Sequence, residues 1–261
     1  MTQPILETKI DLLPVSIYQT NETMGQAAAR EAAQIIQQAV REKGSANIII
    51  ATGNSQLTFL EALRETDGVD WSKVAIFHMD EYVGLAPGHA ASFPAFLRHH
   101  LLDHIPSPAA FHPVIARAGH LETDCADYAG LLRAHPADFC AMGIGENGHL
   151  AFNDPPYAEF NDPVWVKVVR MDVVSRRQQV GEGHFGSLDE VPTHAITLTI
   201  PALLAAKRVL CIVPEARKAN AVYDTLRGPI SESCPASIMR QKPHVHLYLD
   251  AEAAAKVYPP A

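Results

Sequence analysis

The sequence predicts an α/β fold: a doubly wound, mainly parallel, modified Rossmann-like sheet with helices on both faces. Short β-branched runs alternate with segments of helical periodicity, and several of these runs are apolar without polar alternation. Such runs are typical of strands covered on both faces, and repeated strand–helix units produce parallel sheets. With 261 residues, 48% of them hydrophobic, we expect a single α/β domain over 1–261.

Six segments have the composition of strands: 47–51, 74–78, 138–142, 194–199, 208–213 and 244–249. His and Lys neighbours of the last segment predict that it is an edge strand. Helices are expected over 22–43, 55–66, 92–103, 120–134, 215–226 and 250–256. Asn21 is placed to cap the first helix and Gly44 to end it. The Pro-rich stretch at 155–190 fits this alternation least and is a candidate lid.

Charge and composition argue against several classes of protein. The net charge is −8, with 21 Lys and Arg against 29 Asp and Glu, so a nucleic-acid-binding footprint is missing. No apolar run approaches the roughly 20 residues that span a bilayer, and residues 1–10 lack the apolar core of a signal peptide. The four cysteines show neither a CxxC pair nor close zinc-ligand spacing with His. We therefore expect a cytoplasmic protein with no membrane partner and no metal.

The first segment that suits a ligand is the turn made by Thr52, Gly53, Asn54 and Ser55, directly after the strand at 47–51. Ligands of open α/β sheets bind beyond the carboxyl ends of the strands. A glycine turn at a helix N-terminus presents backbone N–H groups and partial positive charge, which suit a phosphate. The same residues also suit an ordinary helix cap, so this motif decides nothing by itself.

The second segment places two adjacent carboxylates, Asp80 and Glu81, after the strand at 74–78. They could be solvated loop acids or could cap a helix. A carboxylate here could also act as a general base on a proton alpha to a carbonyl or imine, since burial tunes its pKa.

The third segment, 143–154, holds three glycines, His149 and several polar groups behind the strand at 138–142. Glycine at this density indicates close backbone approach. Asp154 follows at a distance that suits orienting the imidazole of His149. The segment is not a GxGxxG dinucleotide fingerprint with its acidic residue about twenty positions on, which argues against a nicotinamide enzyme.

The three segments, in this order, resemble the glucosamine-6-phosphate deaminase family, within a wider group that includes 6-phosphogluconolactonases. The strings at 79–85 and 147–153 carry the resemblance most specifically, and it extends over about 20–255. It implies that the single domain at 1–261 is sugar-phosphate isomerase-like. It implies an aldose–ketose isomerising deaminase that converts glucosamine 6-phosphate and water to fructose 6-phosphate and ammonia, with no metal or organic cofactor. The sequence does not identify the preferred amino sugar epimer.

The resemblance also implies catalytic roles. Asp80 would move a proton between C2 and C1 of the open-chain sugar, and His149 would assist ring opening. Many members of the family have Asp in place of Asn147 and Glu in place of Asp154. Asn147 can orient the ring but brings no charge. The relay of His149 is therefore expected to rest on Asp154, or on Glu146 if that side chain turns inward.

For the substrate phosphate, the resemblance implies binding by the 52–55 turn and Lys218. An arginine joins them, with Arg177 preferred over Arg176. Allosteric members carry Ser, Arg and Lys for an effector phosphate after the third motif, whereas 156–165 has no basic residue. We therefore expect no effector site of that kind and a homo-oligomer, if any, smaller than the allosteric hexamers.

Two other interpretations stay open. A 6-phosphogluconolactonase-type hydrolase shares the fold, but such lactonases usually carry Asp-Glu-Arg where this chain has Asp80, Glu81 and Tyr82. A non-catalytic sugar-phosphate sensor would keep the phosphate turn without turnover. Asn147 favours the sensor, whereas the intact pair of Asp80 and His149 argues against it.

Overall fold

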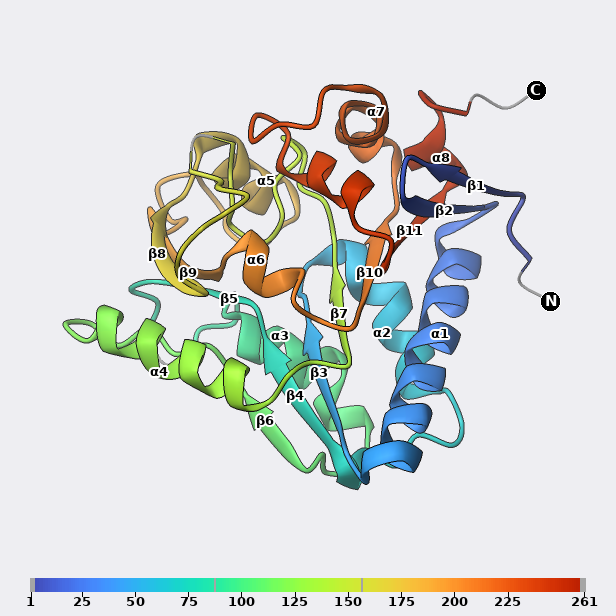
Figure 1. Ribbon diagram of the computed structural model, residues 1–261. Helices are drawn as coiled ribbons and strands as arrows, with labels where there is room; N and C mark the ends of the chain where they lie inside the picture. The colour runs from blue at the N-terminus through green and yellow to red at the C-terminus, as the bar shows by residue number, and fades with distance from the viewer. Residues whose placement is uncertain (1–2, 87, 156, 259–261) are drawn as a thin grey trace.

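The computed structural model describes residues 3–86, 88–155 and 157–258. Positions 1–2, 156 and 259–261 of the predicted domain and lid therefore lie outside the described residues, as does 87. Eight strands form one sheet in the order β1-β2-β11-β10-β7-β3-β4-β6 (Figure 1). Their bounds are Leu6–Ile10 (β1), Leu13–Tyr18 (β2), Ala46–Ile50 (β3), Val74–His78 (β4), Ala110–His112 (β6), Phe139–Met142 (β7), Arg208–Val213 (β10) and Val245–Asp250 (β11). In this sheet β1 and β2 pair antiparallel and the other neighbours pair parallel, which confirms the predicted α/β class.

Helices cover both faces of this sheet. Their bounds are Asn21–Lys43 (α1), Leu57–Arg64 (α2), Phe93–His100 (α3), Leu121–Ala134 (α4), Val173–Gly181 (α5), Ile200–Leu203 (α6), Ala219–Arg227 (α7) and Ala251–Ala254 (α8). Alternate residues of one strand enter different apolar clusters: Ile48 and Ile50 pack with α1, α2 and α3, whereas Ile49 packs with α4, α6, α7 and α8. Because side chains alternate across a strand, two clusters on opposite faces explain why the strand sequences are apolar throughout.

A second, three-stranded antiparallel sheet stands beside the first (Figure 1). It has the order β5-β9-β8, with bounds Asp80–Tyr82 (β5), His194–Leu198 (β9) and Val166–Arg170 (β8). The predicted strand at 194–199 therefore exists but belongs to this smaller sheet. The irregular stretch expected at 155–190 contains β8 and α5.

Two details of the predicted elements are wrong. The strand at 244–249 is not at an edge, because β11 lies between β2 and β10. Its His246 is held by Ser16, 2.9 Å away, and by Glu31, 3.0 Å away, so a polar side chain here does not indicate solvent exposure. The N-cap of α1 is Thr20, whose Oγ1 accepts the backbone N–H of Thr23.

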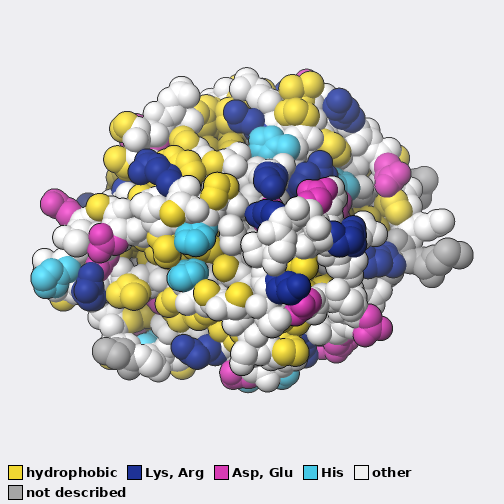
Figure 2. Space-filling view, turned by 60° about the horizontal axis from the view of Figure 1, so that its bottom comes forward, with side chains coloured by type: hydrophobic (Ala, Val, Ile, Leu, Met, Phe, Trp, Pro, Cys, Tyr) yellow, Lys and Arg dark blue, Asp and Glu magenta, His cyan; other side chains and the backbone are white. Residues whose placement is uncertain are grey.

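Asn21 and Gly44 bound the same helix in different ways. Asn21 accepts a hydrogen bond of 2.7 Å from Oγ1 of Thr58, which ties α1 to α2. Gly44 is the predicted C-cap and takes a left-handed conformation. In the described part of the chain, no helix combines the length and apolar character needed to cross a membrane. On the face shown in Figure 2, basic, acidic and apolar side chains are interspersed.

Candidate active site

The three segments singled out in the sequence meet in one cavity at the carboxyl ends of the parallel strands. The cavity is lined by residues that follow β3, β4, β7 and β10 and by side chains at the end of α5. The predicted site residues among its lining are Thr52, Gly53, Ser55, Asp80, His149 and Lys218. Strand ends far apart in the sequence are thereby brought to one place, as expected for an open α/β sheet.

The turn at 52–55 presents its backbone to this cavity. Gly53 has a φ of 97°, a conformation that favours glycine and allows the sharp exit from β3. Asn54 points aside, and its Nδ2 donates to the carbonyl oxygen of Glu182 at 3.3 Å. Gln56, which the sequence did not single out, donates from Nε2 to Oγ of Ser55 at 3.1 Å and so fixes that hydroxyl.

The adjacent carboxylates of the second segment diverge. Asp80 lines the cavity and is 7% exposed. Burial, reinforced by the neighbouring charge of Glu81, raises the pKa of Asp80 well above its usual range. Glu81 turns away and accepts the backbone N–H groups of Tyr82 at 2.7 Å and Phe93 at 3.2 Å. Burial raises the pKa of Glu81 to about 7, although these two donors oppose the shift.

The imidazole of His149 is held through Nδ1. This atom lies 2.7 Å from Oδ1 of Asn147, 2.9 Å from Oγ of Ser175 and 3.2 Å from Oδ1 of Asp154. Nδ2 of Asn147 donates to Asp154 at 3.0 Å, so Oδ1 of Asn147 faces the ring and accepts a hydrogen bond from the N–H at Nδ1. In that tautomer, Nε2 is the ring nitrogen left for a ligand.

Asp154 is the carboxylate that supports this ring. It is fully buried, and it accepts hydrogen bonds from Oγ of Ser175 and, at 3.0 Å, from the backbone N–H of Asp172. Burial alone would raise the pKa of Asp154, but the hydrogen bonds from His149, Asn147 and Ser175 lower it to about 2. Of the two carboxylates that the sequence offered, Asp154 therefore contacts the imidazole.

Gly145 explains the density of glycine in the third segment. A Cβ atom on Gly145 would lie 2.0 Å from Cε1 and 2.2 Å from both nitrogens of the His149 ring. The imidazole therefore rests directly on the backbone of Gly145, and any side chain there would displace it.

Lys218 also lines the cavity and is buried, with 2% of its surface exposed. It follows β10 and stands at the end of a short 3₁₀ turn, Ala216–Lys218, that leads into α7. Burial lowers the pKa of Lys218, and the nearby carboxylate of Glu182 opposes that shift.

With this geometry the chain can be compared with known proteins. Residues 19–248 match the family model described as Glucosamine-6-phosphate isomerases/6-phosphogluconolactonase. The chain belongs to this family.

Individual relatives agree with this family assignment. The glucosamine-6-phosphate deaminase of Bacillus cytotoxicus is 33% identical over 239 residues, 92% of this chain and 87% of the relative. The deaminase of Bacillus cereus strain G9842 is 36% identical over 220 residues, 84% of this chain and 81% of the relative. The structure of a monomeric glucosamine-6-phosphate deaminase superposes with a TM-score of 0.84 at 31% identity, covering 93% of this chain and 99% of that one. A 6-phosphogluconolactonase from Shewanella baltica OS155, at 21% identity, shares the fold with a TM-score of 0.74, covering 94% and 100%.

In this member of the family, the arginine expected at the anion site is not brought to the cavity. Gln178 and Glu182, four positions apart at the end of α5, line the cavity, whereas Arg177 lies on another side of the helix and is exposed. Arg176 donates from Nη2 to two backbone carbonyls within 188–191, at 2.6 and 2.9 Å, and so has a structural partner. The helical period separates these arginines from the residues that face the cavity.

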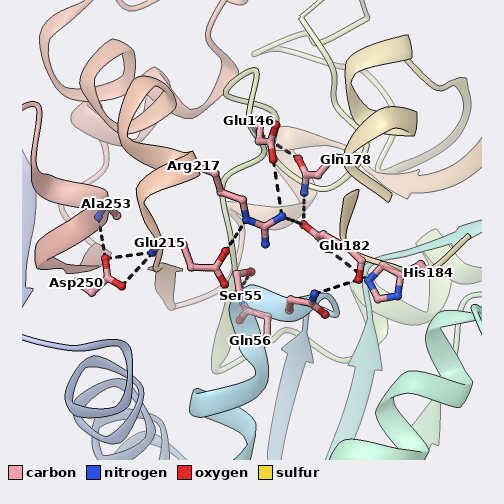
Figure 3. Close-up of polar contacts among 11 residues, drawn as sticks. Ser55, Gln56, Glu146, Gln178, Glu182, His184, Glu215, Arg217, Asp250 and Ala253 are labelled. Atoms are coloured by element: carbon pink, nitrogen blue, oxygen red, sulfur yellow. Dashed lines mark hydrogen bonds and ion pairs between the residues drawn. The ribbon is translucent and has the colours of Figure 1, made fainter. Parts of the chain in front are cut away.

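A different arginine, Arg217, stands next to the site (Figure 3). Its Nη1 lies 3.0 Å from Oε1 of Glu182 and 3.7 Å from Oε1 of Glu146, and its Nε donates to Glu215 at 2.5 Å. Glu146 therefore turns to Arg217 and not to His149. Sequence analysis missed Arg217, although its place directly before Lys218 was a usable signal. Within the described ranges, no group of three or more His, Cys, Asp or Glu side chains is arranged to hold a metal ion.

Proposed function

We propose that this chain deaminates and isomerises glucosamine 6-phosphate, giving fructose 6-phosphate and ammonia. The observation that carries the proposal is that Asp80 and His149 line one cavity with the 52–55 turn and Lys218. A base, a proton donor for ring opening and an anion subsite thus face the same space. The relatives called glucosamine-6-phosphate deaminases, at 33% and 36% identity, support the choice of substrate.

The phosphate end of the substrate is assigned to the turn and Lys218. Backbone N–H groups after Gly53 and the hydroxyl of Ser55 can donate to phosphate oxygens, and the ammonium of Lys218 supplies charge. Because Lys218 is buried, its charge acts in a medium that screens it weakly. This end fixes the sugar so that C1 and C2 reach Asp80.

The ionised carboxylate of Asp80 takes the proton from C2 and returns a proton at C1. Its pKa is raised by burial, so the carboxylate has a higher proton affinity than an exposed aspartate. The proton shift turns the C1 aldehyde with a C2 amine into a C1 alcohol with a C2 imine. Water then adds to C2 and ammonia leaves, which gives the ketose phosphate.

His149 exchanges the proton that opens and closes the sugar ring. With Nδ1 held by Asn147 and Asp154, Nε2 transfers a proton between the C1 hydroxyl and the ring oxygen. The charge of Asp154 stabilises the imidazolium that forms during this transfer. This replaces the need for a charged residue at the position of Asn147.

One assay separates the three interpretations. Protein given glucosamine 6-phosphate should release ammonia and fructose 6-phosphate in equal amounts, and Asp80→Asn should lower this rate at least about 10³-fold while substrate still binds. Hydrolysis of 6-phosphogluconolactone without ammonia release would select the lactonase. Saturable sugar-phosphate binding without turnover of either compound would select the sensor.

Further properties are proposed on the same basis. The reaction is assigned to protein side chains with no metal or organic cofactor, in a single domain within the cytoplasm. A monomer or small homo-oligomer without an effector site fits the lack of basic residues in 156–165 and the monomeric relative.

The 155–190 segment, which carries α5, is proposed as the lid. Parallel assays with glucosamine and galactosamine 6-phosphates would identify the preferred epimer.

A further inference from the structure

A carboxylate, Glu182, stands inside the anion subsite. Its side chain is 5% exposed, and it lines the same cavity as Gly53 and Lys218. Oε2 of Glu182 comes within 3.7 Å of the position that a Cβ atom on Gly53 would take. The carboxylate is therefore in contact with the turn that suits a phosphate. Because such a turn favours a carboxylate as well as a phosphate, Glu182 takes a place that a phosphate also suits.

Each oxygen of this carboxylate has a partner (Figure 3). Oε1 accepts from Nε2 of Gln178 at 2.8 Å and from Nη1 of Arg217 at 3.0 Å, and Oε2 lies 3.4 Å from Nε2 of His184. Burial alone would raise the pKa of Glu182, but His184, Arg217 and Lys218 lower it to about 2. The group is therefore charged at neutral pH.

The charges around the subsite do not favour a dianion as they stand. Arg217 lies between three carboxylates, those of Glu182, Glu215 and Glu146. Lys218 adds a second cation, so three carboxylates stand against two cations. An incoming phosphate would meet the carboxylate of Glu182, which is already paired with Arg217. The like charges of the phosphate and this carboxylate repel strongly in a buried site.

We propose that Glu182 is a specificity-determining residue: its carboxylate occupies the place beside Arg217 and the 52–55 turn that a substrate phosphate takes, and the phosphate must displace it. The idea rests on the proposed function, since it takes the anion to be the phosphate of a sugar. A sugar phosphate also gains contacts with Asp80 and His149, which offset the displacement. Inorganic phosphate gains none of them, so the free protein rejects it.

The test is the affinity of inorganic phosphate for the intact protein, measured by isothermal titration calorimetry at fixed ionic strength. Glu182→Gln keeps the size of the side chain and its contact with Gln178 but removes the charge. This variant should bind inorganic phosphate at least about tenfold more tightly than the wild type. The matched control is Glu215→Gln, which removes another carboxylate from Arg217 but lies outside the cavity lining. Its affinity should stay within about threefold of the wild type.

Either of two results would overturn the proposal. Equal or weaker phosphate binding by Glu182→Gln would make Glu182 a residue that binds the substrate itself, for example through a hydroxyl or an ammonium. An equal gain in both variants would show that any carboxylate near Arg217 acts alike. If circular dichroism shows that Glu182→Gln is unfolded, Glu182→Asp, whose charge is withdrawn by one methylene, should still bind phosphate more tightly than the wild type, and no gain refutes the idea.

The outcome is independent of turnover. Should the wild type release no ammonia from glucosamine 6-phosphate, the proposed function fails, while the phosphate titrations still decide the place of Glu182. Should ammonia be released and Glu182→Gln gain no phosphate affinity, the proposed function stands and the displacement by phosphate is wrong.

Discussion

Nε2 of His78 lies 3.6 Å from Oδ1 of Asp80, and neither atom has a hydrogen-bonding partner among the described residues. His78 is fully buried, and its ring makes a T-shaped contact with Phe93, which lines the cavity. Burial lowers the pKa of His78 to about 3, so the ring is neutral at neutral pH. A small approach of the two atoms would let an N–H at Nε2 donate a hydrogen bond to the carboxylate, which would stabilise the ionised form of Asp80.

Replacement of His78 by Phe should therefore raise the apparent pKa of Asp80. The ionised carboxylate loses its nearest donor, so the acidic limb of the pH–rate profile moves to higher pH and kcat near pH 7 falls about tenfold. Ammonia release measured from pH 5 to 9 checks this. His112→Phe, on β6 and packed against Phe77, is the matched control. An unchanged acidic limb in His78→Phe would contradict the proposed contact.

Replacement of Glu81 by Gln should move the same limb in the opposite direction. The charge of Glu81 is one cause of the raised pKa of Asp80, so its removal lowers that pKa and extends activity to lower pH.

The same variant, Glu81→Gln, also tests how stability depends on pH. Folded Glu81 has a pKa of about 7 against 4.5 for the ordinary group, so the folded state binds more protons between these values. Its contribution to the free energy of unfolding is lost as pH rises through about 7. In urea titrations, the free energy of unfolding should fall less between pH 5 and pH 8 in Glu81→Gln than in the wild type. An equal fall in both proteins would refute this assignment.

Replacement of Asp154 by Asn should lower kcat about 10²-fold with little change in KM. The imidazolium of His149 loses its counter-charge, while the hydrogen bonds that place the ring are largely kept. Steady-state kinetics of ammonia release provides the measurement. Asp172→Asn is the control, because Asn caps the start of α5 as well as Asp. A large rise in KM in Asp154→Asn would indicate a binding role instead.

Replacement of Lys218 by Met should raise KM for the sugar phosphate at least about thirtyfold, since a buried cation is lost from the anion subsite. Arg177→Ala should change KM less than about threefold, because this side chain is exposed and does not line the cavity. The pair is compared in one kinetic series. Equal effects of the two substitutions on KM would indicate that Arg177 also binds the phosphate.

Replacement of Gly25 by Ala should destabilise the fold by about 1–3 kcal/mol. A Cβ atom there would lie 2.6 Å from Oγ1 and 2.7 Å from the backbone carbon of Thr58, where α1 and α2 pack closely. Gly130→Ala is the matched control: it lies within α4 with nothing within 4 Å of its Cβ position, and should stabilise by about 0.5–1 kcal/mol. Urea unfolding of both variants gives the comparison.

The strands and helices that the sequence predicted correctly are those whose burial dictates their composition. The apolar residues of β3 face helices on both sides, so their pattern reports the fold directly. β5 and β6 have three residues each, too few for any pattern, and β1 is largely exposed. The interior place of β11 depends on the hairpin that covers it, which local sequence does not reveal.

Some site residues could likewise be predicted from the sequence and others could not. Asp80 and His149 each stand in a short motif directly after a strand, so the order of the strands brings them to the same cavity. The contacts of Ser175, Glu182 and Arg217 depend on how α5 is seated over the cavity, and a one-residue rotation of that helix would exchange Glu182 for a neighbour. The same dependence on the seating of α5 leaves Arg177 exposed and outside the cavity lining.

Only Met79 separates β4 from β5, and its carbonyl accepts the N–H of Leu198 at 2.8 Å. The chain therefore leaves one sheet and enters the other within a single residue, directly before Asp80. A group anchored at such a junction keeps its position when the pieces around it change. Glu182 directly follows α5 and belongs to neither sheet. Replacing the α5 segment should therefore alter which anion is accepted while Asp80 stays in place.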